Sequence, residues 1–349
     1  MRKFDYTFLK KISVPADIMN SATSIYEMKA KAELRRSDFA EVFSAMESVA
    51  KIQSVKSSNA IEGIITTDKR IRDIVNKSTA PQGHNELEIA GYRDALDLIH
   101  GSYSEIPFSE KSILELHRIL LQPSGDDLAG RYKTEDNFII ETDREGVRSV
   151  RFTTVPASET AFAMEQLILA YHAAYSDAEI NPLMLIPCVI LDLLCIHPFR
   201  DGNGRMSRLL SLLLMYKSGF NAGKYVSIEE QINTYKNYYY TSLQKSSERW
   251  HENDNDYFPF IDNFLFNLKM SYFELDSRFA SLKDRKITKK QRIEELVTGS
   301  LLPVSKREIC EKLPDISVTT VEAELARLLK SGRIEKIGNG RGTVYRSCR

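Results

Sequence analysis

Apolar residues three and four positions apart recur through most of the first 280 residues, and this spacing is typical of amphipathic helices. Two clear runs are Leu114, Leu116, Ile119 and Leu120, and Phe162, Met164, Leu167, Ile168 and Tyr171. A chain of 349 residues is long enough for one main core and a smaller second domain. We therefore expect a mainly α-helical body with an appended domain.

One segment interrupts the helical pattern. Residues 137–141 are rich in Ile and Phe, residues 142–146 are mostly polar and end in glycine, and residues 147–152 again carry Val and Phe. This order of apolar and polar stretches predicts a β-hairpin. We expect Ser158 to cap the helix that follows, with Glu159 in its first turn.

The composition changes after residue 282. Residues 283–349 carry 16 Lys and Arg against 9 Asp and Glu, a net charge of +7, so the first 282 residues carry −7. Three helices and then two strands are expected there, at 289–297, 306–312, 318–331 (capped by Ser317), 334–337 and 343–346. This order is typical of a winged helix-turn-helix, and its basic charge weakly favours a polyanionic partner.

The composition also excludes several classes of protein. Apolar residues make up 42% and charged residues 28% of the chain, as in ordinary globular proteins. The most apolar stretch, 183–196, contains Pro187 and Asp192 and is shorter than the roughly 20 residues of a membrane span. The N-terminus lacks the apolar run of a signal peptide, and the four cysteines form no CxxC pair. We therefore expect a cytoplasmic protein.

The most informative segment runs from His197 to Arg208, between two predicted apolar helices. Gly202 and Gly204 allow backbone conformations that are closed to other residues, and the free N–H groups of a helix start form an anion-binding nest. Arg205 precedes Arg208 by three positions, so both guanidinium groups are expected to reach the same anion. Phosphate is the expected ligand.

The same loop carries two further candidates. Asp201 supplies a hard oxygen that suits a Mg²⁺ ion shared with phosphates. His197 changes protonation near neutral pH, as a general base must. The tetrapeptide Gly-Asn-Gly-Arg is weak evidence by itself, since it recurs at 338–341, but the full twelve-residue arrangement is specific.

This segment resembles the motif of the Fic family, His-x-Phe-x-Asp/Glu-Gly-Asn-Gly-Arg-x-x-Arg, at every specified position. The resemblance extends over about 87–266, and it includes a Gly-Arg-Tyr sequence before the predicted hairpin. It implies a helical Fic fold and transfer of AMP from ATP to a Ser, Thr or Tyr hydroxyl of a target protein. The expected parts are an N-terminal helical region (1–81), a Fic catalytic domain (82–282) and a winged helix-turn-helix domain (283–349).

The resemblance also implies residue roles. His197 would deprotonate the target hydroxyl, Asp201 would hold Mg²⁺, and Phe199 would anchor the loop in the core. The phosphates of ATP would lie against Gly202, Asn203, Gly204, Arg205, Met206, Ser207 and Arg208. Tyr239 and Tyr240 resemble the tyrosine pair that borders the nucleotide base in relatives, although helical tyrosines are more commonly packing residues.

The resemblance suggests an inhibitory contact and a hairpin flap that binds the target. Ser58, Glu62 and Gly63 match an inhibitory motif in which Glu62 would pair bidentately with Arg208 and keep basal activity low. Glu62 could instead be an ordinary solvated glutamate on a helix. It could also position water for removal of AMP. The hairpin at 137–152 would let an extended target segment add as a strand, or it is an ordinary surface hairpin.

Other functions stay open. A Fic enzyme could transfer another group, or a DNA-binding regulator could use its Fic core to sense nucleotide. His197 argues against the regulator, and Asp201 with Arg208 argues against a phosphoryl transferase. DNA is a candidate partner of 283–349. However, the second helix of the predicted helix-turn-helix, at 318–331, carries Glu322 and Glu324, which favours protein contact or a homodimer. Self-modification is a further candidate.

Overall fold

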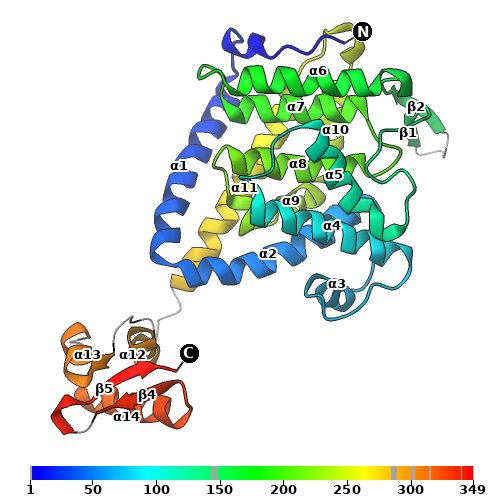
Figure 1. Ribbon diagram of the computed structural model, residues 1–349. Coiled ribbons are helices and arrows are strands. Elements are labelled where there is room, and N and C mark those ends of the chain that lie inside the picture. The colour runs from blue at the N-terminus through cyan, green and yellow to red at the C-terminus, as the bar shows by residue number, and fades with distance from the viewer. Residues whose placement is uncertain are drawn as a thin grey trace. The chain divides into compact units, whose positions relative to one another are not determined.

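The computed structural model describes residues 2–142, 146, 148–283, 289–298, 300, 303–313, 316–338 and 340–348. It divides into two compact units, Met1–Ser277 and Arg278–Arg349. Helices dominate the first unit, and one small hairpin accompanies them (Figure 1). The expectation of a mainly helical fold with a β-hairpin and a small C-terminal α/β region is therefore confirmed.

The helices of the first unit follow one another through mostly short connections, except between α5 and α6, where the hairpin lies. They are α1 (Ala16–Asp38), α2 (Ala40–Ile61), α3 (Asp68–Val75), α4 (Gly83–Ser102), α5 (Glu110–Leu121), α6 (Ala157–Tyr175), α7 (Pro182–Ile196), α8 (Asn203–Lys217), α9 (Ile228–Thr234), α10 (Lys236–Ser247) and α11 (Phe258–Lys283), which continues past the unit boundary. Its described residues also form short 3₁₀ turns, η1 (Thr7–Lys10), η2 (Gln122–Ser124), η3 (Ala222–Lys224) and η4 (Trp250–Glu252).

Helix α7 is the centre of the core. Every residue from Leu183 to Ile196 is buried, as expected for a helix that is apolar on all sides. It packs between α6 and α8 (Figure 1), and α2 packs against α4 and α9. The central position of α7 and α8 fixes the loop between them, which carries the motif.

The hairpin consists of β1 (Phe138–Thr142) and β2 (Arg148–Thr153), paired antiparallel with Ile139 opposite Phe152 and a bulge after Ile139. Most of its predicted turn, 142–146, lies outside the described residues. The expected cap of α6 was wrong: Pro156 takes that position, and Ser158 lies inside the first turn. The Asp136 carboxylate, from outside the helix, accepts the Ala157 N–H of the first turn at 2.7 Å.

The second unit has the expected order of helices and hairpin, with one added strand. Its elements are α12 (Lys289–Thr298), β3 (Val304–Ser305), α13 (Lys306–Lys312), α14 (Val318–Lys330), β4 (Ile334–Ile337), η5 (Gly340–Gly342) and β5 (Val344–Ser347). Ser317 caps α14 as predicted, by accepting a bond from Thr320 N. The strand order is β3-β5-β4, and the helices bury Ile293, Ile309 and Leu328 beneath it.

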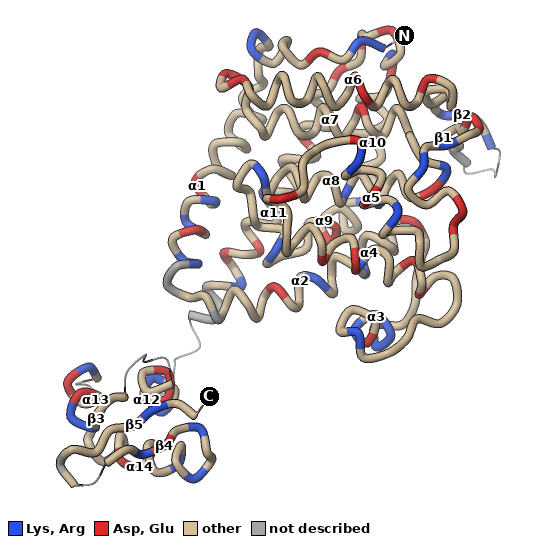
Figure 2. Tube along the Cα trace, viewed as in Figure 1, with Lys and Arg blue, Asp and Glu red and all other residues tan. Residues whose placement is uncertain are grey.

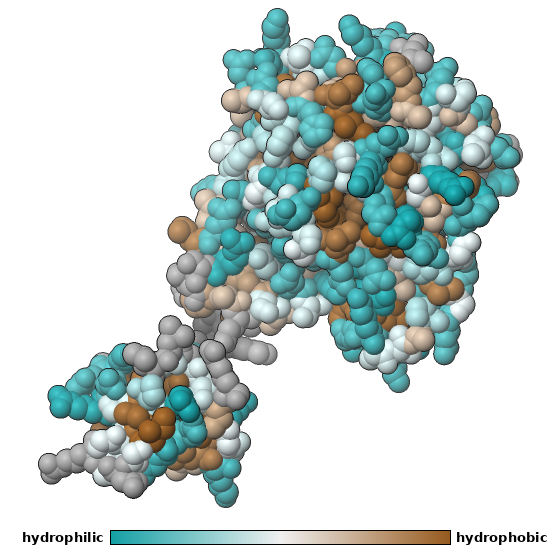
Figure 3. Space-filling model, in the orientation of Figure 1, coloured by the Kyte–Doolittle hydropathy of each residue, from teal (hydrophilic) through white to brown (hydrophobic). Residues whose placement is uncertain are grey.

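Apolar and polar side chains both reach the surface. On the face that Figure 3 shows, apolar side chains gather in the middle of the first unit and polar ones surround them. Among the described residues, none of the helices combines the length and the apolar character that a bilayer crossing needs.

Candidate active site

His197 marks the end of α7. It adopts a left-handed backbone conformation (φ 52°), which is uncommon for a residue with a side chain, and its N–H bonds to Leu193 O at 3.0 Å. The chain thereby turns sharply out of the core helix. Strained backbone of this kind persists where the surrounding packing holds it, as in many active sites.

A backbone contact orients the His197 ring. Its Nδ1 lies 3.2 Å from Leu194 O, and because a carbonyl only accepts, Nδ1 must carry the proton of this bond. Nε2 then keeps a free lone pair. Burial lowers the pKa of His197 to about 4, so the imidazole is neutral at physiological pH and able to accept a proton.

The loop ends at Gly202, whose φ of 80° places it in the left-handed region. Helix α8 begins at the next residue without a side-chain cap, so the N–H groups of its first turn face outward as an anion-binding nest. The Asn203 side chain does not face this nest. It is bonded at both ends to the Phe199 backbone, at 3.0 and 2.8 Å, and so holds the loop closed.

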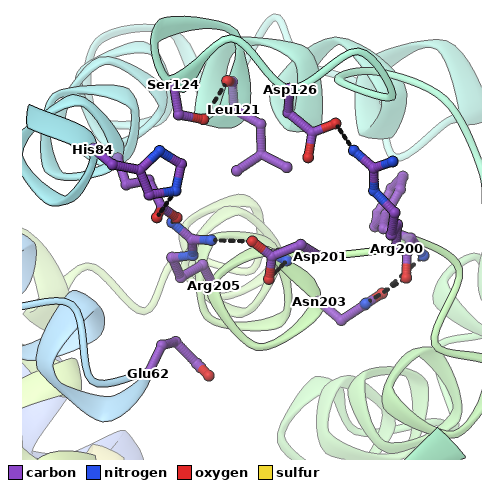
Figure 4. A network of polar contacts seen from close by, with 12 residues as sticks. Glu62, His84, Leu121, Ser124, Asp126, Arg200, Asp201, Asn203 and Arg205 are labelled. Atoms are coloured by element: carbon purple, nitrogen blue, oxygen red, sulfur yellow. Dashed lines mark hydrogen bonds and ion pairs between the residues drawn. The ribbon is translucent and has the colours of Figure 1, made fainter. Parts of the chain in front are cut away.

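The two arginines of the motif point in different directions. Arg205 is buried and pairs with Glu88 at 2.5 Å and with Asp201 at 3.1 Å; Figure 4 shows the second contact. Arg208 instead reaches Ser58 and Glu62 at the end of α2. The structure therefore does not bring both guanidinium groups to one point, because Glu88 on α4 holds the first.

The contact between Arg208 and Glu62 is present. Arg208 Nη2 lies 2.8 Å from Glu62 Oε1, and its Nε and Nη2 also donate to the Ser58 hydroxyl and carbonyl at 2.8 and 2.9 Å. The predicted bidentate geometry was wrong, since Nη2 bonds to Glu62 Oε1 and to Ser58 O while Nε donates to the Ser58 hydroxyl. Gly63 follows with a φ of 81° and ends this segment.

One pocket of about 200 Å³ collects much of the predicted site. Its lining includes Glu62, His197, Gly204, Arg208, Tyr239 and Tyr240. Burial raises the pKa of Tyr239 to about 12, so its hydroxyl remains a donor. The buried side chains of Met206 and Ser207 do not line this pocket, and neither does Arg205.

Asp201 lies at the rim of the loop with its side chain 62% exposed. One carboxylate oxygen accepts the Gly202 N–H at 2.6 Å and the other pairs with Arg205. No group of three or more His, Cys, Asp or Glu suited to a metal occurs in the described part of the chain. A single exposed carboxylate fits a Mg²⁺ ion that is bound mainly by substrate phosphates and water.

Several residues of the pocket were missed from the sequence. Arg151 and Phe152 come from β2, and Ser247 from the last turn of α10. Helical spacing could have found Ser247, because it lies eight residues, or about two turns, after Tyr239. The Nε atom of Arg151 is buried and has no hydrogen-bond partner in the described structure, which is unusual for a guanidinium.

His117 has a structural role beside this site. Its ring stacks on Phe199 with centroids 3.7 Å apart, and Nδ1 accepts the Gly130 N–H at 3.0 Å. Nε2 must then donate to Asp201 O, 3.1 Å away. Burial lowers its pKa to about 4, and the neutral ring therefore supports the loop from below.

Comparison with known proteins agrees with this geometry. Residues 107–215 match the model of the Fic/DOC family. The protein adenylyltransferase Fic of Nematostella vectensis is 31% identical over 181 residues, covering 49% of this chain and 39% of that protein. The protein adenylyltransferase fic-1 of Caenorhabditis elegans is 30% identical over 194 residues, covering 54% and 33%. The chain thus spans less than half the length of these relatives.

A solved structure resembles the whole chain. The crystal structure of a Fic family protein from Desulfovibrio desulfuricans G20 has a TM-score of 0.64 and 19% identity, and the match covers 97% of both chains. At this identity the likeness concerns the fold alone. The family match shows that the chain carries a Fic/DOC family domain at residues 107–215.

Proposed function

We propose that this protein transfers AMP from ATP to a hydroxyl of a target protein. The observation that carries the proposal is the pocket in which the free Nε2 of His197 meets the first turn of α8 and Arg208. A base and an anion-binding nest in one pocket suit attack of an alcohol on a phosphate ester. The naming of two relatives as protein adenylyltransferases supports the same chemistry.

In the proposed reaction, His197 Nε2 accepts the proton of the target hydroxyl as its oxygen bonds to the α-phosphorus. The bond from that phosphorus to the bridging oxygen breaks, and pyrophosphate leaves. The α8 amides and Arg208 offset the negative charge of the phosphates, as preorganised donors do without reorganisation during the reaction. Arg205 acts differently in this proposal, because it holds Asp201 and Glu88 in place.

Asp201 would hold Mg²⁺ together with the phosphates, since its carboxylate is exposed beside the nest. The ion would neutralise phosphate charge. Tyr239, Tyr240 and Phe152 offer flat apolar walls for the base on the other side of the pocket.

Glu62 would restrain this activity. Its carboxylate occupies the space directly over Gly204, where an anion bound to the α8 nest would lie, and it engages Arg208. A phosphate would have to displace it. We therefore propose low basal transfer that rises when Glu62 moves away or is replaced.

An extended segment of the target would dock on the hairpin. Phe138, Ile140 and Val150 expose about half of their side chains there, at 52%, 52% and 58%. Exposed apolar residues on a two-stranded sheet suit addition of a further strand. A segment of this same protein would be one such target.

The test uses ATP labelled at the α-phosphate, with Mg²⁺, and follows label on protein. Glu62→Gly is expected to raise labelling above the wild type, and His197→Ala in that background is expected to abolish it. Asp68→Asn serves as a control, because it breaks another ion pair near α2, with Lys56 at 2.6 Å. Nucleotide binding without α-label in any variant would refute AMP transfer.

For residues 278–349 we propose a protein-contact role of the winged-helix type. Acidic residues lie among the basic ones of this unit (Figure 2): Lys306 pairs with Glu322 at 2.6 Å, and Arg327 with Glu294 at 2.9 Å. These pairs leave little cationic surface on α14 for DNA phosphates. Tight, salt-sensitive binding of the full chain to duplex DNA would contradict this role.

A further inference from the structure

Lys133 is a buried cation between the hairpin and the catalytic loop. Its side chain is only 4% exposed, and Nζ donates to Asn137 Oδ1 at 2.8 Å, to Thr154 Oγ1 at 2.9 Å and to Ile196 O at 3.2 Å. Asn137 directly precedes β1 and Thr154 directly follows β2. Ile196 directly precedes His197. One ammonium group therefore joins both ends of the hairpin to the residue before the base.

Backbone contacts reinforce this connection. Lys133 N donates to Pro198 O at 2.9 Å, and Asn137 Nδ2 donates to Phe199 O at 2.9 Å. Thr154 Oγ1 is also 2.6 Å from Asn137 Oδ1. Three carbonyl groups on either side of His197, at 196, 198 and 199, thus receive donors from Lys133 and Asn137, so a shift of the hairpin changes the support of the loop.

We propose that Lys133 is a positioning residue that couples the seating of the hairpin to the orientation of His197. The proposal rests on the proposed AMP transfer, whose base is His197. A buried ammonium with three acceptors holds its partners firmly, because an unpaired charge in that place would be costly. Docking of a target strand on the hairpin would then be transmitted through Asn137 and Thr154 to the loop.

The charge of Lys133 also acts on His197. Lys133 opposes protonation of the imidazole, whereas Glu62 and Asp201 favour it. Two further cations, Arg151 and Arg208, line the same pocket as His197. Asp136 is the acidic group that acts on Lys133 itself. Loss of the ammonium would therefore raise the pKa of His197 as well as loosen the loop, and a purely structural lysine elsewhere would do neither.

The experiment compares variants in the Glu62→Gly background, where transfer is expected to be measurable. Lys133→Met should lower kcat for α-label transfer on the order of 10- to 100-fold with little change in the KM for ATP. The acid limb of its pH profile should move to higher pH. Lys224→Met is the matched control, because the half-buried Lys224 also donates to a backbone carbonyl, His100 O at 2.9 Å. Lys224→Met should leave both kcat and the acid limb of the pH profile unchanged.

A second variant covers the case in which Lys133→Met does not fold. Thr154→Val removes one acceptor and keeps the charge, so kcat should fall several-fold while the acid limb stays in place. Unchanged kcat and an unmoved limb in folded Lys133→Met, or an unchanged kcat in Thr154→Val, would overturn the proposal. Titration of the His197 ring by NMR tests the coupling separately from AMP transfer. If no α-label is transferred at all, a higher His197 pKa in Lys133→Met still supports the coupling. An unchanged His197 pKa refutes it.

Discussion

The Glu62 carboxylate lies so close over Gly204 that a Cβ atom on that glycine would collide with Glu62 Oε1. Gly204 has ordinary helical geometry, so its backbone does not require glycine. The missing side chain matters instead because it leaves room above the α8 nest. In the structure Glu62 uses that room while it also holds Arg208.

This relationship predicts a coupling between the two residues. Gly204→Ala should push the Glu62 side chain away and weaken its bond to Arg208. In the Glu62→Gly background alanine would meet only a tight contact with Arg208 Nη1, 3.3 Å away, and should gain about 0.5–1 kcal/mol of helix propensity. We expect a coupling energy of about 1 kcal/mol in a double-mutant cycle measured by urea unfolding. Additivity of the two substitutions would show that the contact contributes nothing to stability.

The low pKa of His197 predicts an unusual pH dependence. A base with a pKa of about 4 stays neutral at pH 5.5, whereas one with the ordinary pKa of about 6.5 would be roughly 90% protonated there. Transfer by Glu62→Gly should therefore change less than about twofold between pH 7.5 and 5.5. Initial rates of α-label transfer at the two pH values check this, and a tenfold fall would mean that burial does not control the base.

His117 should support both stability and nucleotide binding. His117→Ala removes the bonds to Gly130 N and Asp201 O and leaves a gap beside Phe199, so the free energy of unfolding should fall by about 2–4 kcal/mol. Affinity for ATP should fall as well, because the loop loses its support. His172→Ala is a suitable control, since this exposed ring makes one bond, to Phe108 O. Equal losses of stability and ATP affinity in the two variants would contradict the role of His117 in supporting the loop.

Arg151 should contribute to nucleotide affinity. Its unpartnered Nε and its place in the pocket wall suggest a donor that awaits an acceptor on the ligand. Arg151→Met in the Glu62→Gly background should weaken binding of a non-hydrolysable ATP analogue about tenfold without loss of thermal stability. Arg148→Met, on the exposed part of the same strand, should bind normally. Calorimetry measures both, and equal affinities would remove Arg151 from the site.

The sequence was sufficient for the parts of the site that are local. His197, Gly202 and Gly204 lie within eight residues, so their positions on a loop and a helix start follow from helix ends and, at Gly202, from the conformation that glycine allows. The order of elements in 278–349 follows from caps and apolar spacing in the same way. Local rules govern both, since they need no knowledge of distant neighbours.

Contacts between distant segments were the part that the sequence did not predict. Arg205 was expected to bind phosphate because it lies three residues before Arg208, but Glu88 on α4 takes its guanidinium. Lys133 gave no signal in the sequence, and its role depends on where the hairpin ends meet the loop. Such partners are chosen by tertiary packing, which single-residue patterns do not contain.

The N-terminal segment offers a last test of long-range packing. Asp192, in the middle of α7, is completely buried, and it accepts bonds from Trp250 Nε1 at 2.6 Å, Tyr6 at 2.8 Å and Tyr257 at 2.9 Å. Arg2 lies 3.5 Å from it and supplies the opposite charge. Burial raises the pKa of the Asp192 carboxyl, so the charged form depends on these partners.

Arg2→Ala should therefore destabilise the protein by about 3–5 kcal/mol, because a buried carboxylate loses its counter-charge. Asp192→Asn in addition should recover part of that loss, since the neutral amide no longer needs the cation. Lys3→Ala is the control at the neighbouring position, where the side chain makes no ion pair among the described residues. Thermal unfolding of the three variants tests the role of the Arg2 charge. If Asp192→Asn does not reduce the loss of stability in Arg2→Ala, Arg2 acts through its packing on Trp250, whose ring centroid lies 5.0 Å away, and not through charge.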